Sequence, residues 1–211
     1  MRDNTAKCGA VIEFFNVYKN VNEILKDRGY DVLVAGTVLA TLEEFKKRFS
    51  GSSSPCSFDR SAMNFICQND KKLVMVYFSN EISIGKKDIE DIHGKMKIGK
   101  IFHCILVYPK QITSSAVKHI PTMTKYRIET FADDDLIINI TKHNMMPKFH
   151  VLLPEEKEVL FAETNLRGGE LSRISLNDPI AKYYGMVRGD IVKITRKSQT
   201  AGLYITFRIC N

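Results

Sequence analysis

The sequence has no closely spaced pair of cysteines and no hydrophobic run long enough to cross a membrane. Its five cysteines are an odd number at wide intervals: Cys8, Cys56, Cys67, Cys104 and Cys210. A zinc site or a disulfide framework needs paired cysteines, so we expect reduced, buried thiols in an intracellular protein. The most apolar stretch, residues 32–40, falls well short of the ~20 residues that a bilayer requires. The amino terminus also has no apolar core of the signal-peptide kind.

A nucleotide-binding motif is incomplete as well. Residues 94–100 are one residue short of a P-loop, and Ile101 stands where that motif needs a hydroxyl group for magnesium. A helical pattern precedes this segment and a strand pattern follows it, which is the reverse of the order that points backbone N–H groups at a phosphate. We therefore expect no cofactor and no small-molecule ligand.

Metal-ligating and catalytic patterns are also absent. Asp133–Asp135 cannot converge on one ion in an extended chain, because adjacent side chains point to opposite faces, so we expect a solvated turn there. The same geometry separates His103 from Cys104, for which buried packing is favoured. The remaining histidines show no ligand spacing to each other or to a cysteine: His93, His119, His143 and His150. We expect no metal and no catalytic residue.

One catalytic alternative stays open. Asp70 and Lys72 fit the acid-x-lysine half of an endonuclease metal site. No Pro-Asp pair precedes them at the start of a strand, and residues 70–72 lie where a polar hairpin turn would lead into residues 73–78. The turn is favoured, and a metal-dependent nuclease is kept as an alternative. Magnesium-dependent cleavage of nucleic acid by the isolated chain, lost on Asp70→Ala, would support that alternative.

Size and charge allow one large or two small globular domains. The chain has 211 residues, and 44% of them are hydrophobic, which is enough to fill a packed core. Its net charge of +7 permits contact with a polyanion, but the charge is spread along the chain. Free-standing DNA binders carry a clustered basic stripe, so a DNA-binding adaptor is kept only as a second alternative.

Hydrophobic periodicity predicts an α/β layer structure for the amino-terminal part of the chain. Helices are expected over residues 11–28, 41–49 and 88–96. Strands are expected over residues 58–67, 73–78 and 102–108. Thr41 and Glu44 have the spacing of a capping box at the start of the second helix. The second strand is so uniformly apolar that we expect it to be covered on both faces.

A domain boundary is predicted between residues 142 and 143, since Met145-Met146-Pro147 fits neither a helix nor a strand period. Pro154 then opens a helix that should run to about Thr164, with two glutamates near the positive end of its dipole. This boundary gives domains of residues 1–142 and 143–211. The predicted fold class is α/β or α+β, with a mixed α/β second domain.

The densest structural signals lie in residues 172–209. Asp178 before Pro179 is an N-cap with proline in the first turn, and Gly185 supplies a left-handed stop, so a short helix is expected between them. Residues 190–196 and 203–209 alternate between apolar and polar, as the half-buried strands of one hairpin do.

These residues resemble a known family. The segments DPIAKYYG, from Asp178, and RGDIVKITRKSQTAGLYITFRIC, from Arg188, are similar to the carboxy-terminal assembly domain of the fifth subunit of eukaryotic RNA polymerases, which has a counterpart in the archaeal enzyme. The likeness continues through LPEEKEVL, from Leu153. It extends more faintly through KDRGYDV, SNEISIGKK, ITSSAVK and INITKHNMMPKF, so nearly the whole chain is covered. The first domain would then be the family's α/β jaw.

The resemblance implies a non-catalytic subunit of a multisubunit DNA-directed RNA polymerase. Its carboxy-terminal domain would dock on the largest subunit, among other polymerase subunits, through an exposed face rich in arginine and tyrosine. The candidate docking residues are Arg173, Asp178, Pro179, Tyr183, Arg188, Arg196, Thr200, Gly202, Tyr204 and Arg208.

The jaw would guide downstream double-stranded DNA. The candidate DNA-facing residues are Thr113, Ser114, Ser115 and Lys118. They resemble the family's T-P-S-A element, with Ser114 in place of its proline, and a helix cap there offers hydroxyls and N–H groups to a phosphate. Contacts of this kind would position the duplex without reading its bases.

Location follows from the same resemblance. A cellular subunit would lie in the nucleus. The absence of tryptophan and the irregular residues 50–58 depart from cellular relatives, which suggests a homologue in a large DNA virus with its own transcription machinery. Such a protein would be found in the host cytoplasm and the virion.

Overall fold

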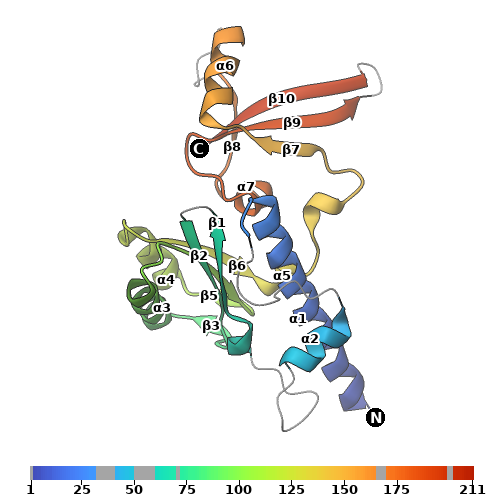
Figure 1. Cartoon of the computed structure of the whole chain (residues 1–211), viewed down its shortest axis with the longest axis vertical. Coiled ribbons are helices and arrows are strands. Elements are labelled where there is room, and N and C mark those ends of the chain that lie inside the picture. Colours follow the sequence, from blue (N-terminus) through green and yellow to red (C-terminus); the bar gives the residue numbers. More distant parts are fainter. Residues whose placement is uncertain (1, 32–40, 50–59, 70–71, 165–169, 199–201) are drawn as a thin grey trace. The chain divides into compact units, whose positions relative to one another are not determined.

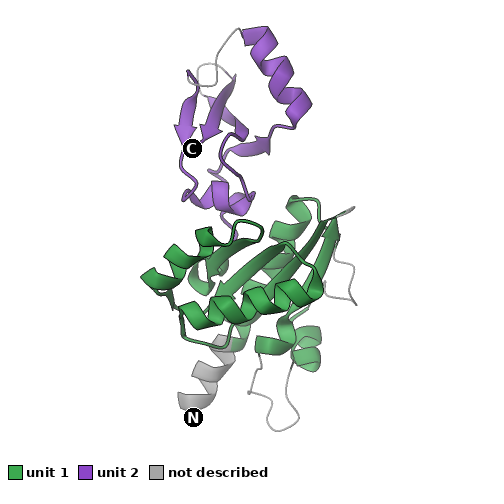
Figure 2. Ribbon diagram, turned by 90° about the vertical axis from the view of Figure 1, so that its left-hand side faces the viewer, with its two compact units in different colours: residues 1–138 green, residues 139–211 purple. Residues whose placement is uncertain are grey.

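The computed structural model describes residues 2–31, 41–49, 60–69, 72–164, 170–198 and 202–211, with side chains from Val11 onward. The chain divides into two compact units, residues 1–138 and 139–211 (Figure 2). The sequence placed this division between residues 142 and 143. Asn139 belongs to the second unit, because its side chain accepts a hydrogen bond from Thr141 N at 3.0 Å and donates one to the Tyr183 hydroxyl at 3.3 Å.

A four-stranded mixed sheet forms the centre of the first unit. Its order is β1-β2-β4-β6. The strands are β1 (Phe65–Asn69), β2 (Lys72–Phe78), β4 (His103–Tyr108) and β6 (Arg127–Ala132). β1 pairs with β2 in antiparallel orientation, and β2, β4 and β6 are parallel. A separate parallel pair joins β3 (Ser83–Ile84) to β5 (Gln111–Ile112).

Helices cover both faces of this sheet (Figure 1). On one face lie α1 (Arg2–Asp27) and α2 (Leu42–Phe49), where the buried ring of Tyr18 contacts Phe45, Phe65 and Phe78. On the other face, α3 (Lys86–Gly99) and α4 (Ser114–His119) pack on Cys104 and Leu106. The unit is therefore an α/β/α sandwich, and the predicted α/β class is confirmed.

The predicted helices of this unit are present. Glu44 N donates to the Thr41 hydroxyl at 3.3 Å, as the capping spacing predicted. The P-loop-like residues 94–100 are the last turns of α3 and its cap. None of the helices in the described ranges combines the length and apolar character that a membrane crossing requires.

Two predictions about this unit are wrong. The strand expected over residues 58–67 begins only at Phe65, since η1 (Arg60–Met63) is a turn of 3-10 helix. The expected solvated turn at Asp133 is instead the start of α5 (Asp133–Leu136). One ion pair connects these two segments, because the buried Arg60 guanidinium donates to the Asp133 carboxylate at 2.5 and 2.9 Å. Two further short helices complete the described segments of this unit and of the next: η2 (Ile120–Thr122) and η3 (Ile140–Lys142).

The second unit is built on another four-stranded sheet, of order β7-β9-β10-β8. The strands are β7 (Lys148–Val151), β8 (Ser172–Ile174), β9 (Ile191–Ser198) and β10 (Gly202–Cys210). The helix α7 (Pro179–Tyr183) covers one face, over Val192 and Ile194. The helix α6 (Pro154–Thr164) covers the other face, over Ile191 and Ile209. The predicted helix from Pro154 to Thr164 and the hairpin are confirmed.

The alternation along β10 predicted one fully buried face, and this prediction is wrong for part of the strand. Leu203 and Ile205 belong to the expected buried face, yet they are 66% and 47% exposed. The register places them on the α6 side of the sheet, with Phe207 and Ile209. α6 packs only on the Phe207 and Ile209 end of this row, which leaves the hairpin end uncovered. A similar error concerns Leu73 in β2, which is 39% exposed although that strand was expected to be covered on both faces.

Candidate interface surfaces

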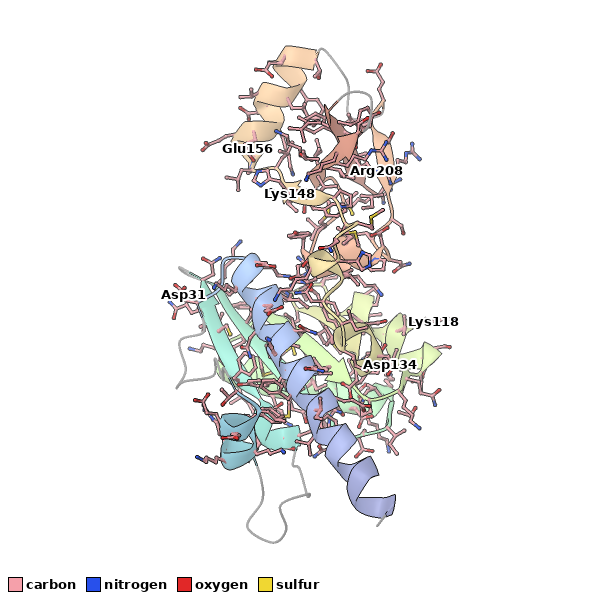
Figure 3. All side chains as sticks on the ribbon, turned by 90° about the vertical axis from the view of Figure 1, so that its right-hand side faces the viewer. Asp31, Lys118, Asp134, Lys148, Glu156 and Arg208 are labelled. Atoms are coloured by element: carbon pink, nitrogen blue, oxygen red, sulfur yellow. The ribbon has the colours of Figure 1, made fainter. Side chains whose placement is uncertain are left out.

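Thr113 holds together the predicted DNA-facing segment. Its hydroxyl accepts from Ala116 N at 3.3 Å, which caps α4, and donates to Ile84 O at 3.0 Å. It also lies 3.1 Å from the Ser115 hydroxyl. Thr113 is thus the residue that forms the cap, while Ser114, Ser115 and Lys118 remain exposed. Figure 3 shows Lys118 at the periphery of the first unit.

Three lysines that were not predicted from the sequence lie beside this segment in the structure. Thr113 N donates to Ile84 O at 3.0 Å, so the start of α3, with exposed Lys86 and Lys87, lies beside the α4 cap. Gln111 N donates to Ile82 O at 3.4 Å, which brings exposed Lys110 to the same edge. Only the β3–β5 pairing reveals this gathering of positive charge. We call Lys86, Lys87, Lys110, Thr113–Ser115 and Lys118 the α4-cap surface.

A buried charge cluster ties α1 to the sheet at the opposite strand ends. The Glu129 carboxylate lies 2.8 Å from Arg28 Nη2 and 2.9 Å from both His103 Nε2 and Arg127 Nη2. Burial raises the pKa of Glu129, but the hydrogen bond with His103 and the charges of Arg28 and Arg127 outweigh it and hold the pKa at about 2. The cluster holds Arg28, the residue after α1, against the sheet, and the Glu129 carboxylate offsets part of the positive charge there.

The predicted cap of α7 is confirmed. The Asp178 carboxylate accepts from Ile180 N at 2.9 Å, Pro179 occupies the first turn, and Gly185 has a φ of +62°. Asp178 and Pro179 therefore shape the second unit, and Gly202 does the same in the hairpin with a φ of +69°. These three residues have a structural role that is visible without any partner.

The arginine-rich face is only partly as expected. The Arg196 guanidinium lies 4.7 Å from the centre of the exposed Tyr204 ring, on the α7 side of the sheet, and Arg208 is exposed on that same side. Arg173 is exposed on the α6 side, and Arg188 Nε donates to Asn211 Oδ1 at 3.0 Å. Figure 3 shows Arg208 and Lys148 projecting from different sides of this sheet.

Tyr183 does not belong to the exposed face that the sequence predicted. It is buried, its ring lies 5.1 Å from that of Tyr184, and its hydroxyl accepts the hydrogen bond from Asn139. Thr200 lies outside the described residues. The structure instead adds Leu203 and Ile205, and we call these two with Arg196 and Tyr204 the hairpin-end surface. The alternation of apolar and polar residues included Leu203 and Ile205, but it predicted that both would be buried in the core.

The residues of the nuclease alternative are not brought into a described site. Asp70 lies outside the described residues, and Lys72 is the exposed first residue of β2. In the part of the chain that the structure describes, no three histidine, cysteine or acidic side chains lie close enough together to hold a metal ion. Cys104 is buried and burial raises the pKa of its thiol to about 12, while the neighbouring His103 contacts Glu129.

The chain folds as two compact units, each of which mixes helices with a four-stranded sheet. Residues 10–96 match the model of the RNA polymerase Rpb5 amino-terminal domain, and residues 138–210 match that of the Rpb5 carboxy-terminal domain. The chain belongs to the RNA polymerase Rpb5 family, a family of transcription subunits.

Two relatives resemble the chain along most of its length. It is 38% identical over 200 residues to the DNA-directed RNA polymerases I, II, and III subunit RPABC1 of Caenorhabditis briggsae, and 37% identical to that of Caenorhabditis elegans. Each match covers 92% of this chain and 94% of the relative. Among solved structures, a DNA-bound ATP-dependent Type ISP restriction-modification enzyme aligns with 82% of this chain and 11% of its own, at 14% identity. Its TM-score of 0.39 is too low to support a functional argument.

Proposed function

We propose that this chain is a non-catalytic subunit of a DNA-directed RNA polymerase. In this proposal it docks on the largest subunit through residues 139–211 and guides the downstream duplex with residues 1–138. The observation that carries the proposal is the match of both Rpb5 domain models, together with RPABC1 relatives that align over 92% of the chain. The location would be that of the polymerase it serves, the nucleus for a cellular chain; a viral source stays a prediction.

The hairpin-end surface supports the docking part of the proposal. Arg196 and Tyr204 lie on one side of the β9–β10 hairpin, and Leu203 and Ile205 lie on the other. Beyond the areas covered by α6 and α7, the hairpin therefore presents an arginine–tyrosine pair and two aliphatic side chains back to back. Arginine and tyrosine are enriched at binding hot spots, and burying the remaining exposed area of Leu203 and Ile205 is favourable by about 1 kcal/mol or more each. A groove in the partner that encloses the hairpin end would use both sides.

The α4-cap surface supports the DNA-guiding part. Four exposed lysines surround the hydroxyls of Thr113, Ser114 and Ser115. Lys86 lies 3.6 Å from Glu90, and exposed ion pairs of this kind are weak. The charge of Lys86 therefore remains accessible to a phosphate. Lysine and hydroxyl groups of this kind contact the DNA backbone without reading sequence.

Crosslinking in the assembled polymerase tests the proposed function. The enzyme is bound to a template whose downstream duplex carries photoreactive nucleotides, and crosslinked peptides of this chain are mapped. We expect crosslinks within residues 86–87 and 110–119, and a yield that falls roughly threefold on Lys118→Glu because one phosphate contact is replaced by repulsion. Lys125→Glu, at the opposite strand ends of the same unit, is the matched control and should leave the yield unchanged. Crosslinks that map elsewhere, or equal yields for both variants, would contradict the proposal.

A further inference from the structure

The strand β10 is longer than its neighbour β8, so part of its outer edge is unpaired. β10 has nine residues, and β8 pairs only with Arg208–Cys210. In the described part of the second unit, no strand pairs with residues 203–207 on the side of β8. We call residues 203–207 on that side the open edge of β10.

The backbone groups that face the open edge follow from the hydrogen bonds at the end of β10. Cys210 N donates to Asp190 O at 2.7 Å, on the β9 side. Asn211 N donates to Ile174 O at 3.0 Å, on the β8 side. Because successive residues of a strand direct their N–H and C=O groups to alternate sides, the odd-numbered residues of β10 face outward. Three of these residues lie on the open edge: Leu203, Ile205 and Phe207.

The open edge lacks the features that keep an exposed strand from pairing. Natural sheets protect such strands with proline, lysine or a bulge, or cover them with another element. Residues 202–207, of sequence GLYITF, contain neither proline nor a charged residue. Their register with β9 runs one to one, without a bulge. An unprotected edge of this kind is suited to β-augmentation, in which an extended segment of a partner adds a strand to the sheet.

The side chains on the two faces of β10 indicate the chemistry of such a segment. Leu203, Ile205 and Phe207 lie on the α6 side, where apolar side chains of an added strand would pack beside them. Arg196 and Arg208 lie on the α7 side, where carboxylates of that strand would be favoured. The matching segment therefore alternates between apolar and acidic residues.

Charge argues against a second copy of this chain as the added strand. β7, β9 and β10 together contain five lysines and arginines and no acidic residue. The acidic residues of this unit lie on α6, at Glu170 before β8, and at Asp178 and Asp190. Two copies paired through the open edge would bring two cationic sheets together. A nucleic acid would meet the same cations, but it has no alternating N–H and C=O groups to match the edge.

We propose that an extended segment of a neighbouring polymerase subunit, with alternating apolar and acidic residues, adds to the sheet along the open edge of β10. This inference rests on the proposed function, in which the second unit docks on the polymerase. The added strand forms hydrogen bonds with the outward backbone groups of Leu203, Ile205 and Phe207. Docking then depends on the backbone of the hairpin as well as on its side chains.

Hydrogen exchange at single residues, in the free chain and in the assembled polymerase, tests this inference. In the free chain, the N–H groups of Leu203, Ile205 and Phe207 should exchange fast. Those of Tyr204 and Thr206 face β9 and should be protected in both states. In the assembled enzyme, exchange of the three outward groups should slow by at least about tenfold.

The exchange experiment separates failure of this inference from failure of the proposed function. A chain that assembles but whose three outward N–H groups still exchange fast overturns the inference and leaves the docking proposal intact. A chain that does not assemble with the polymerase contradicts the proposed function and this inference with it. Protection of the same groups in a free chain of dimeric mass would assign the open edge to a second copy.

Ile205→Pro tests the backbone contact itself, with Ile205→Ala as the matched control. Both changes remove the aliphatic side chain, but only proline removes the outward N–H group, and neither removes a hydrogen bond to β9. Each tagged variant competes with the unchanged chain for assembly, and mass spectrometry gives the ratio incorporated. We expect at least about fivefold less incorporation for the proline variant than for the alanine variant. Equal incorporation of the two folded variants would overturn the inference, and the exchange experiment on the unchanged chain decides it if the proline variant does not fold.

The acidic character of the segment is tested by Arg208→Glu in the same competition. This change places a carboxylate on the α7 side beside the open edge, so incorporation should fall roughly threefold through repulsion. Lys148→Glu is the control, because it makes the same charge change on β7, at the other edge of the sheet. Equal incorporation of these two variants would show that the added strand is not acidic.

Discussion

Replacing Glu129 with glutamine is expected to lower the free energy of unfolding of the first unit by about 3 kcal/mol, because it removes the carboxylate that faces the buried Arg28 guanidinium. The Arg28 side chain is only 5% exposed and its guanidinium is 2.8 Å from the Glu129 carboxylate. Urea denaturation followed by far-ultraviolet circular dichroism measures the loss, since the chain has no tryptophan. Hydrogen exchange of peptides from residues 103–132 assigns it to this sheet.

Glu90→Gln is the matched control for that change. Glu90 is an exposed carboxylate 3.6 Å from Lys86 and 3.5 Å from His119, and exposed pairs of this kind contribute little to stability. We expect its free energy of unfolding to change by no more than about 0.5 kcal/mol. Equal losses for the two variants would show that the cluster around Glu129 does not stabilise the fold.

The pH dependence of the Glu129→Gln effect has a definite sign. The folded chain holds the pKa of Glu129 at about 2, below the ordinary value of 4.5 that applies to the unfolded chain. The stabilisation is therefore complete above pH 4.5 and is lost as the pH falls from there toward 2. The difference in free energy of unfolding between the unchanged chain and the variant should narrow over this range. A difference that stays constant would contradict the assigned pKa.

The double change Leu203→Asp and Ile205→Asp is expected to abolish assembly with the polymerase while leaving the second unit folded. Both side chains are exposed in the isolated chain, so charges there cost the fold little. In a docked hairpin the same charges would be buried without partners, which costs several kcal/mol and weakens binding by at least about 100-fold. The measurement is the amount of the largest subunit recovered with the tagged variant.

Met145→Asp with Val159→Asp provides the control for the hairpin change. These residues are also exposed and apolar and also belong to the second unit, but they lie outside the hairpin. Recovery of the largest subunit should be unchanged. If the two double variants recover the subunit equally, whether fully or not at all, the hairpin end is not the docking surface.

Local signals in the sequence were sufficient for the short elements. The Asp178 cap and Gly185 stop act within a few residues of each other, so α7 could be placed from the sequence. The turn at residues 60–63 could not be placed from the sequence, because Arg60 is hydrogen-bonded to Asp133, which lies 73 positions away. Glu129 was missed for the same reason, since Arg28 and His103 reach it from other elements.

The candidate surfaces show a second limit of sequence patterns. Alternation along β10 identifies which side chains share a face, but it does not show how far α6 extends over that face. Leu203 and Ile205 were therefore assigned to the core, although α6 covers only Phe207 and Ile209. Thr113 was identified as a cap, but the nearby Lys86 and Lys110 required the β3–β5 pairing.

Affinity purification of the tagged full chain from the cells that encode it tests the central claim most directly. Membership in a complex is the property on which the docking and DNA-guiding proposals both depend. We predict that the two very large polymerase subunits co-elute with the chain in stoichiometric amounts, as identified by mass spectrometry. A chain that elutes as a lone monomer, with the hairpin end accessible to solvent, would contradict the account.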